Sequence, residues 1–336
     1  MPFQFARVAV VGAGYMGGGI AQVFAANGTD CVVADASREA TYRAVAALTL
    51  QARRHKEAGL ISAQACQRML RCVRGAESVE NAVRDADFIV EAVPESREIK
   101  SQVLSEISRL SRPDAVIGTN TSAMPISELA ESVEHLERFL GVHWMNPPLH
   151  VPCVEVIPTS ATDPRAVHAV MQLLRDSGKT PTQVADSPGF VASRLQYALL
   201  KECTRLVEEG VADPSQVDEV VRNSFGFRLP FFGPFAIADL AGLDVYAGGF
   251  ASLEKAYGER MAPPRSLTER VAAGRCGLKS GAGFFEFDGS GADRIARHRD
   301  VAYARLAELK RALGEVDFKS ESSDAVTQQG RRLNVD

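Results

Sequence analysis

The sequence predicts an α/β protein, in which a Rossmann-type, mostly parallel sheet domain is followed by an all-α C-terminal domain. A glycine-rich stretch from Val8, VAVVGAGYMGGGIAQVFAANG, lies between a strand-like run and a helix-like pattern. Strand-like and helix-like segments alternate through the first half, and long helical patterns with almost no strand signal follow Val191. These features together are typical of a dinucleotide-binding sheet domain joined to a helical domain.

Short aliphatic and β-branched runs bounded by Gly, Pro, Asn, Asp or Ser predict the strands of the first half. These runs lie at residues 7–14, 30–37, 86–95, 114–122, 138–145 and 153–159. Helical patterns lie between several of them, most clearly at 38–58 and 96–110. This alternation indicates βαβ units with right-handed crossovers, and therefore a sheet covered by helices on both faces.

The pattern changes after TQVADSPGF, which places the domain boundary near Ser187–Pro188. We therefore expect a sheet domain over 1–187, a helical domain over 188–318 and a polar, disordered tail over 319–336. The stretch RLQYALLKECTRLVEEG predicts a helix closed by Gly210. Asp213 as a cap and Pro214 at the first position predict the start of the next helix.

The composition is typical of a globular protein that handles small molecules. Of 336 residues, 46% are hydrophobic and 24% charged, and the formal charge of −4 provides no attraction for nucleic acid or an acidic membrane. The chain opens without the pattern of a signal peptide, and no apolar run has the length of a membrane span, so we expect a cytoplasmic protein. The six scattered cysteines lack C-x-x-C spacing, which argues against structural zinc and thioredoxin-like chemistry, and are typical of small core residues in a reducing cytoplasm. The histidines lack metal-ligand spacing, so we expect no metal.

The glycine loop predicts a nicotinamide dinucleotide site. Gly12, Gly14 and Gly17 form G-x-G-x-x-G directly between a strand and a helix, which is the context that this motif requires. Gly12 permits the tight turn, Gly14 lets the backbone approach a pyrophosphate, and Gly17 lets the helix pack on the strand. Asp35 ends the second strand, where a carboxylate binds the ribose hydroxyls and repels a 2′-phosphate. The site therefore favours NAD over NADP, although Arg38 lies close enough to weaken this preference.

Three polar residues follow the later strands in a pattern that suits dehydrogenation. Ser122 and His143 come at strand carboxyl ends, where ligands bind in open α/β sheets, and Glu155 lies in an apolar strand twelve residues after His143. A histidine can take the proton of an alcohol while a nicotinamide takes the hydride, and a carboxylate orients its imidazole. Taken alone, each residue is more often structural than catalytic. Their coincidence at one sheet edge favours catalysis.

At this point the chain resembles the 3-hydroxyacyl-CoA dehydrogenases, from about Arg7 to Phe287. The matching stretches, in order, are GAGYMGGGIAQVFA, FIVEAVPE, TNTSAMPISEL, HWMNPP, VEVIP, DSPGFVASRL, GPFAIADLAGLDVY and GLKSGAGFFEF. The resemblance implies a homodimer formed through the helical domain, with NAD as cofactor.

The resemblance also implies roles for individual residues. His143 would be the catalytic base, Glu155 its orienting carboxylate, and Ser122 and Asn146 would hold the substrate hydroxyl and carbonyl. Lys279 of GLKSG would reach the cofactor from the helical domain. The implied cofactor-binding residues are Gly12, Gly14, Tyr15, Met16, Gly17, Asp35, Glu95, Lys100, Asn120 and Lys279.

The chain departs from the family pattern P-G-F-x-x-N-R at Ser193, which stands where the family has Asn. A serine hydroxyl has a shorter reach, so we expect the substrate-side network to differ, with a water or another substrate group in the gap. HWMNPPLHVP and RLQYALLKECTRLVEEG are more similar to the L-gulonate 3-dehydrogenase (lambda-crystallin) and carnitine dehydrogenase branches. VEVIP, GPFAIADLAGLDVY and GLKSGAGFF are more similar to the acyl-CoA enzymes.

The first functional hypothesis is reversible, NAD-dependent oxidation of a short-chain L-3-hydroxyacyl-CoA to the 3-oxoacyl-CoA. The alternatives are oxidation of a free 3-hydroxy carboxylate such as L-gulonate or L-carnitine, oxidation of a carrier-bound hydroxyacyl group, and a non-enzymatic, crystallin-like role. The intact glycine loop, His143 and Glu155 argue against the last. A basic run on a predicted helix offers mild support for CoA phosphates but is also typical of a solvated face; it contains Arg53, Arg54, His55 and Lys56.

Overall fold

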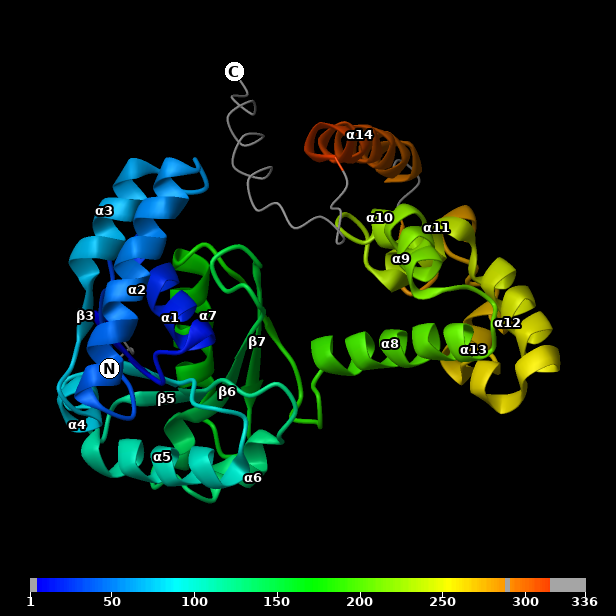
Figure 1. Cartoon of the computed structure of the whole chain (residues 1–336). Coiled ribbons are helices and arrows are strands. Elements are labelled where there is room, and N and C mark those ends of the chain that lie inside the picture. The colour runs from blue at the N-terminus through cyan, green and yellow to red at the C-terminus, as the bar shows by residue number, and fades with distance from the viewer. Residues whose placement is uncertain (1–4, 288–290, 315–336) are drawn as a thin grey trace. The chain divides into compact units, whose positions relative to one another are not determined.

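The structure is a computed structural model that describes residues 5–287 and 291–314 (Figure 1). The chain divides into two compact units, and the division between them falls between Leu200 and Lys201, inside a helix. The predicted disordered tail, residues 319–336, lies outside the described residues.

The first unit is built on one eight-stranded sheet, in the order β3-β2-β1-β4-β5-β6-β7-β8. All neighbouring strands are parallel except β6 and β7, which run antiparallel. The strands are β1 (Arg7–Val11), β2 (Asp30–Ala34), β3 (Val73–Gly75), β4 (Phe88–Glu91), β5 (Val116–Thr119), β6 (Phe139–Trp144), β7 (Cys153–Pro158) and β8 (Thr180–Gln183). Since the strand order reverses at β1, the crevice beyond the carboxyl ends of β1 and β4 is the expected ligand site.

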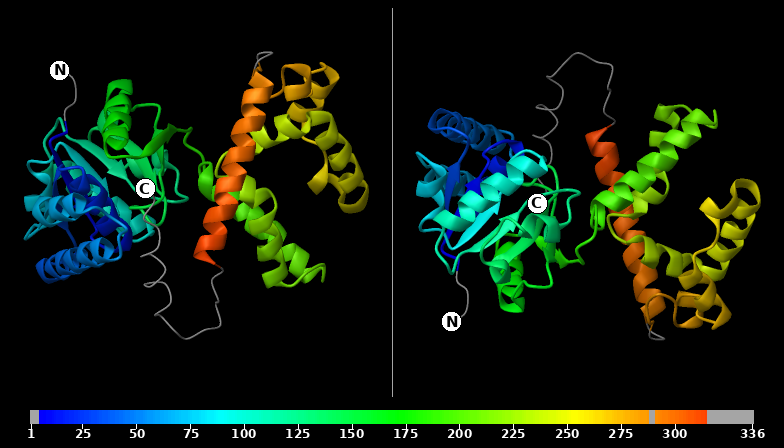
Figure 2. Two further views of the ribbon diagram at one scale, coloured as in Figure 1. Left: turned by 90° about the horizontal axis from the view of Figure 1, so that it is seen from above. Right: turned by 90° about the horizontal axis from the view of Figure 1, so that it is seen from below.

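Helices cover both faces of this sheet, as the views from above and below show (Figure 2). They are α1 (Tyr15–Ala26), α2 (Arg38–Glu57), α3 (Ala63–Cys72), α4 (Val79–Val83), α5 (Arg97–Leu110), α6 (Ile126–Ala130) and α7 (Pro164–Asp176), followed by α8 (Ala192–Glu208). Serine side chains accept the first free backbone N–H groups of α2 to α5; they belong to Ser37, Ser62, Ser78 and Ser96.

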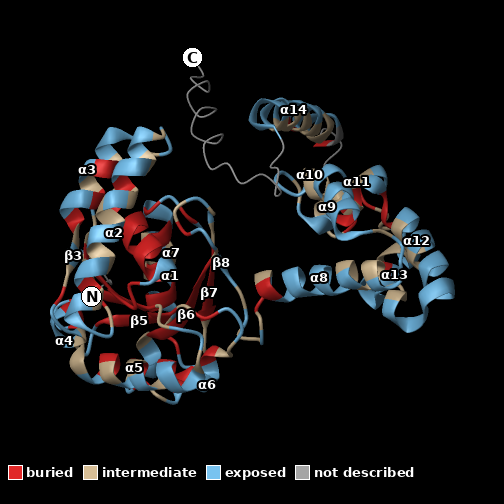
Figure 3. Cartoon of the chain, viewed as in Figure 1, coloured by how far each residue is buried: buried red, intermediate tan, exposed pale blue. Residues whose placement is uncertain are grey.

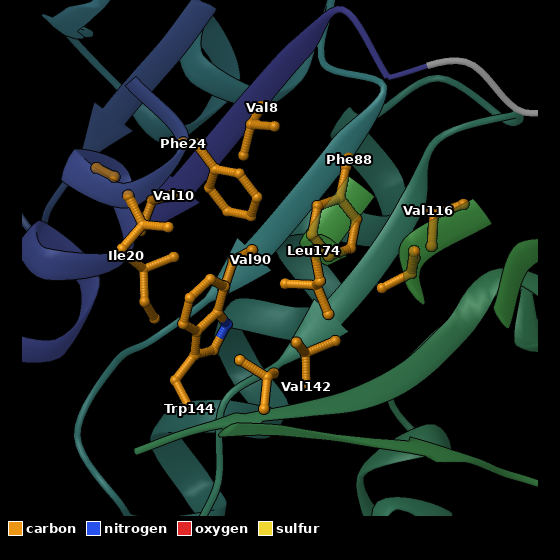
Figure 4. Packing of buried hydrophobic residues seen from close by; sticks show 14 of the residues in the cluster. Val8, Val10, Ile20, Phe24, Phe88, Val90, Val116, Val142, Trp144 and Leu174 are labelled. Carbon is orange, nitrogen blue, oxygen red and sulfur yellow. The ribbon is translucent and has the colours of Figure 1, made fainter. Parts of the chain in front are cut away.

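Two hydrophobic clusters fix these helices to the sheet. On one face, α1 and α7 pack on the strands through Phe24, Leu174 and Trp144, all nearly inaccessible to solvent (Figure 4). On the other face, α4, α5 and α6 pack through a second cluster that includes Leu104 and Ile126. The sheet is therefore buried on both sides, as a parallel sheet requires, whereas most of α8 is exposed (Figure 3).

The second unit is helical in its described residues. It contains the end of α8, then α9 (Pro214–Asn223), α10 (Phe225–Arg228), α11 (Pro234–Ala241), α12 (Leu243–Tyr257), α13 (Arg265–Ala272) and α14 (Gly291–Leu313). No single described helix is long and apolar enough to cross a membrane; α11 and the stretch Leu243–Met261 reach that length and composition only together, with a 101° bend between them.

The predicted fold class is confirmed, and all six predicted strands are present. Asp213 caps α9 in a capping box with Gln216, and Gly210 follows α8 in the left-handed region, at φ +71°. Two strands were not predicted, β3 and β8. Both are edge strands, β3 has three residues, and β8 contains Pro181, which weakens a strand pattern.

Candidate active site

The glycine turn after β1 is shaped by backbone contacts that exclude side chains. Gly12 has φ +94°, and a Cβ there would lie 2.6 Å from the carbonyl oxygen of Ala92. A Cβ on Gly17 would lie 1.8 Å from the carbonyl oxygen of Gly12. Both glycines are therefore required by packing, one for the turn and one for the close approach of α1.

Gly14 differs from these two, because a Cβ on it would meet no atom within 4 Å. It is the N-cap of α1, and no side chain caps the free N–H groups of the first turn. Open space in front of an uncapped helix N-terminus fits the negative charge of a pyrophosphate. These residues therefore fit a dinucleotide cofactor.

Asp35, directly after β2, is held where a ribose would lie. Its Oδ2 accepts the N–H of Ala13 at 2.8 Å, and its Oδ1 accepts the N–H of Ala36 at 2.7 Å. The nearby Arg38 pairs with Glu77 at 3.3 Å, so an acidic partner already engages its guanidinium. A carboxylate without a free cation beside it favours NAD over NADP.

These residues border one cavity of about 980 Å³ at the carboxyl ends of β1 and β4. The predicted site residues in its wall are Gly12, Gly14, Tyr15, Met16, Asp35, Glu95, Asn120 and Ser122. Gly17 lies beneath the turn, and Lys279 belongs to the second unit, where its ammonium pairs with Asp244 at 2.7 Å. The contact of Lys279 with the cofactor stays a prediction.

Lys100, on α5, is fully buried behind the cavity wall. Its ammonium donates to Glu91 at 2.9 Å and to the carbonyl oxygen of Asn120 at 2.8 Å, and it lies 3.6 Å from Glu95. Burial raises the pKa of Glu91, and the ammonium and the hydroxyl of Thr119 oppose that rise. Lys100 therefore holds two residues of the cavity wall, Glu95 and Asn120, from the buried side. Its direct contact with a cofactor stays a prediction.

Glu95 connects the buried Lys100–Glu91 ion pair to Ser122. One of its carboxylate oxygens accepts the hydroxyl of Thr121 and, at 2.9 Å, the backbone N–H of Ser122. The carboxylate thus fixes the loop that carries Ser122. Sequence reasoning missed both Glu91 and Thr121, although a charged residue inside the apolar run FIVE was a usable signal.

His143 and Glu155 form a buried pair across β6 and β7. The register places them directly opposite each other, and His143 Nδ1 lies 2.8 Å from Glu155 Oε2. The other carboxylate oxygen accepts the N–H groups of Val191 and Ala192, both at 3.0 Å. The hydrogen bond to Glu155 favours a proton on Nδ1, which leaves Nε2 free to accept a proton from a substrate.

The remaining predicted substrate residues lie near the ends of neighbouring elements. Asn146 follows β6, three residues after His143, in the connection to β7. Ser193 is buried in the first turn of α8. Neither side chain bonds to His143 or Glu155 among the described residues, so their roles toward a substrate stay predictions.

The basic run on α2 is mostly exposed. Arg53, Arg54 and Lys56 are exposed, whereas His55 is partly buried with its ring centroid 5.7 Å from that of His150. Burial and the neighbouring His150 both lower the pKa of His55. Contact of this basic run with CoA phosphates stays a prediction.

A phosphate-binding turn, a ribose carboxylate and a buried histidine–carboxylate pair together define a nicotinamide-dependent dehydrogenase of alcohols. The model of the 3-hydroxyacyl-CoA dehydrogenase NAD-binding domain matches residues 7–187, and that of the C-terminal domain matches residues 189–287. The chain belongs to the 3-hydroxyacyl-CoA dehydrogenase family, and its members act on CH–OH groups with NAD.

Individual relatives differ in substrate. The chain is 35% identical to the 5-formyl-3-hydroxy-2-methylpyridine 4-carboxylate 5-dehydrogenase of Mesorhizobium japonicum, over 83% of this chain and 90% of that protein. It is 33% identical to a probable 3-hydroxybutyryl-CoA dehydrogenase of Deinococcus radiodurans, over 84% of this chain and all of that protein. The crystal structure of a 3-hydroxyacyl-CoA dehydrogenase from Archaeoglobus fulgidus is similar with a TM-score of 0.74 and 33% identity, over 92% of this chain and 99% of that one.

The ribose assignment predicts the effect of Asp35→Ala. Losing hydrogen bonds to a charged acceptor should weaken NAD binding by about 10- to 100-fold, and losing the negative charge should narrow the preference for NAD over NADP. Fluorescence titrations with NADH and NADPH measure both effects. Asp30→Ala is the matched control, because Asp30 lies at the other end of β2. An unchanged preference in Asp35→Ala would contradict the assignment.

Proposed function

We propose that this chain oxidises a short-chain L-3-hydroxyacyl-CoA, similar to 3-hydroxybutyryl-CoA, reversibly to the 3-oxoacyl-CoA with NAD. The observation that carries the proposal is the 2.8 Å contact between His143 Nδ1 and Glu155, both almost completely buried. A buried histidine that is oriented by a carboxylate suits a general base for a secondary alcohol.

Each residue has a distinct part in this chemistry. His143 takes the hydroxyl proton of the substrate on Nε2, and Glu155 holds the Nδ1 proton and stabilises the resulting imidazolium. Ser122 and Asn146 hold the substrate hydroxyl and carbonyl against that base. Bound NAD would supply the acceptor for the hydride that leaves the carbinol carbon. Gly14, the first turn of α1 and Asp35 would hold its pyrophosphate and ribose.

A free hydroxy carboxylate is the second candidate substrate, and Ser193 favours it. The relative from Mesorhizobium japonicum is named for a pyridine carboxylate, whereas the relative from Deinococcus radiodurans is named for an acyl-CoA. Ser193 replaces the longer Asn of the family pattern, and its hydroxyl forms no hydrogen bond within the described part of the chain. The hydroxyl of Ser193 is therefore available to hydrogen bond a polar group on the substrate.

The assembly and compartment are part of the same proposal. Several large apolar side chains of the second unit are at least half exposed, among them Val220, Phe235, Val245 and Phe285. Such side chains support homodimerisation through the helical domain, and a monomer in sedimentation experiments at all concentrations would contradict it.

The free cysteines suit a reducing compartment, which supports a location in the cytoplasm. Export of the native protein to a cell-free fraction would contradict this location.

A side-by-side assay tests the substrate class. NADH absorbance is followed with NAD and either 3-hydroxybutyryl-CoA, L-gulonate or L-carnitine. We expect the highest kcat/KM with the CoA thioester. A higher kcat/KM for either free acid would move the function to the second candidate.

In His143→Gln, turnover of the preferred substrate should fall at least about 100-fold, the usual effect of losing a general base, with NAD affinity nearly unchanged. Activity that survives this substitution would contradict the assigned base.

Ser193→Asn separates the two substrate classes further. The substitution restores the family residue, so we expect kcat/KM for 3-hydroxybutyryl-CoA to rise by about 10-fold. This is the effect expected from one additional hydrogen bond in the transition state. Activity on a free hydroxy acid should not rise in parallel. Equal changes for both classes would show that position 193 does not select the substrate.

A further inference from the structure

Lys179 presents a buried ammonium to a loop rather than to a carboxylate. Its side chain is 8% exposed, and its ammonium donates to the carbonyl oxygens of Pro148 and Val151, the latter at 2.9 Å, with that of Leu149 at 3.5 Å. It forms no ion pair with any carboxylate of the described chain. Desolvation lowers the pKa of Lys179. Burying a lysine ammonium destabilises the folded protein unless the ammonium is hydrogen bonded. The carbonyl groups of the loop provide these hydrogen bonds to Lys179.

The backbone of Lys179 is itself rigidly held. Gly178 follows α7 in the left-handed region at φ +76° and donates its N–H to Arg175, and the N–H of Lys179 donates to Leu174, both at 2.9 Å. This pair of bonds is a Schellman motif, which ends the helix in one defined conformation. One residue later, the N–H of Thr180 donates to Pro152 at 2.8 Å and starts β8. The backbone of Lys179 is therefore held in one position, at the edge of the sheet where β7 and β8 begin.

The loop in question, residues 145–152, connects β6 to β7 and is called here the hairpin loop. It carries Asn146, and its inner face packs on α1, because a Cβ on Gly19 would lie only 3.1 Å from the Pro148 ring. Within the loop, the N–H groups of His150 and Val151 both donate to the carbonyl oxygen of Pro147, at 3.1 and 3.0 Å. Trp144 ends β6 just before the loop, and its ring lies in the core cluster (Figure 4). The centroid of this ring lies 5.9 Å from the Lys179 ammonium.

We propose that Lys179 is a positioning residue, which gathers the carbonyl groups of the hairpin loop and thereby sets the place of Asn146 relative to His143. The proposal rests on the substrate role proposed for Asn146. Carbonyl dipoles that converge on one point repel one another unless a cation lies between them. Without the ammonium these buried acceptors lose their donors, and the loop must open to reach water.

The consequence for catalysis is specific to the substrate side. No residue of the hairpin loop borders the nucleotide cavity, so loosening the loop should leave NAD binding unchanged. A reactive group misplaced by about 1 Å costs on the order of 100-fold in rate. Lys179 should therefore act on kcat/KM for the substrate and not on the affinity for NAD.

Lys179→Met tests the position of the hairpin loop without requiring turnover. The substitution keeps an unbranched side chain of similar length and removes the ammonium donors. Hydrogen exchange of the His150 and Val151 amides should become at least about 10-fold faster, as expected when a local opening is favoured, while exchange in β1 stays unchanged. Trp144 is the only tryptophan of the chain, so its emission reports the same change directly. Lys255→Met, an exposed lysine on α12, is the matched control and should alter neither signal.

A second variant approaches the loop from the other side. Gly19→Ala places a methyl group against Pro148, so it should also accelerate exchange in the hairpin loop. This variant keeps the test available if Lys179→Met does not fold. Unchanged exchange in a folded Lys179→Met, or equal acceleration throughout the sheet domain, would overturn the proposal.

A double-mutant cycle connects the loop to catalysis. In wild type, Lys179→Met should lower kcat/KM for 3-hydroxybutyryl-CoA by on the order of 100-fold, but in an Asn146→Ala background it should have little further effect. Additive losses, or a matching loss of NADH affinity, would show that Lys179 does not act through Asn146. If wild type turns over none of the three substrates, the proposed function fails, while the exchange and fluorescence results still decide the role of Lys179.

Discussion

The antiparallel pairing of β6 with β7 is the constraint on which the proposed chemistry depends. In a sheet whose other neighbouring strand pairs are all parallel, this one reversal brings the start of β7 to the edge where β6 ends. His143, near the end of β6, and Glu155, near the start of β7, therefore become direct neighbours on one face. In a parallel pairing, the beginning of β7 would lie at the opposite edge of the sheet and the two side chains would be separated.

The same reversal shapes the surroundings of the pair. It makes the connection between β6 and β7 a short loop at the functional edge, which carries Asn146. It also brings the start of α8 onto Glu155, because the N–H groups of Val191 and Ala192 bind the carboxylate oxygen that His143 leaves free. Lys179, just before β8, holds the loop at this edge. A single strand direction thus gathers the base, its orienting group and the loop between them.

The nucleotide side of the sheet rests on a different principle, close packing of backbone. Gly12 and Gly17 are required because neighbouring carbonyl oxygens leave no room for a Cβ, whereas Gly14 leaves an uncapped helix N-terminus open. The glycine turn and the start of α1 are encoded within the same six residues, which is why a short motif predicts them. The cavity beside them also needs distant residues, because Ala92 closes against Gly12 and Asp35 accepts the N–H of Ala13.

The sequence predicted the fold class, six of the eight strands, the Asp213 cap of α9 and the closure of α8 by Gly210, because those features depend on local pattern. It did not predict the edge strands β3 and β8, whose pairing is decided by their one neighbour. It placed His143 and Glu155 at one sheet edge, but their contact depends on the direction of β7, which no local pattern encodes. Lys179 was missed for the same reason, since the carbonyl groups that it binds are about 30 residues away in the chain. Glu91 was missed although its charge interrupts the apolar run FIVE, which is a local signal.

The most direct test of the account is the tautomer of His143, observed by NMR of the protein labelled with ¹⁵N-histidine and assigned with His143→Gln. The account predicts a proton on Nδ1 and an unprotonated Nε2 in the neutral imidazole. In Glu155→Gln, whose amide can donate to Nδ1, the proton should move to Nε2 and kcat should fall by about 10²- to 10⁴-fold. A wild-type Nε2–H tautomer, or an unchanged tautomer and rate in Glu155→Gln, would contradict the account.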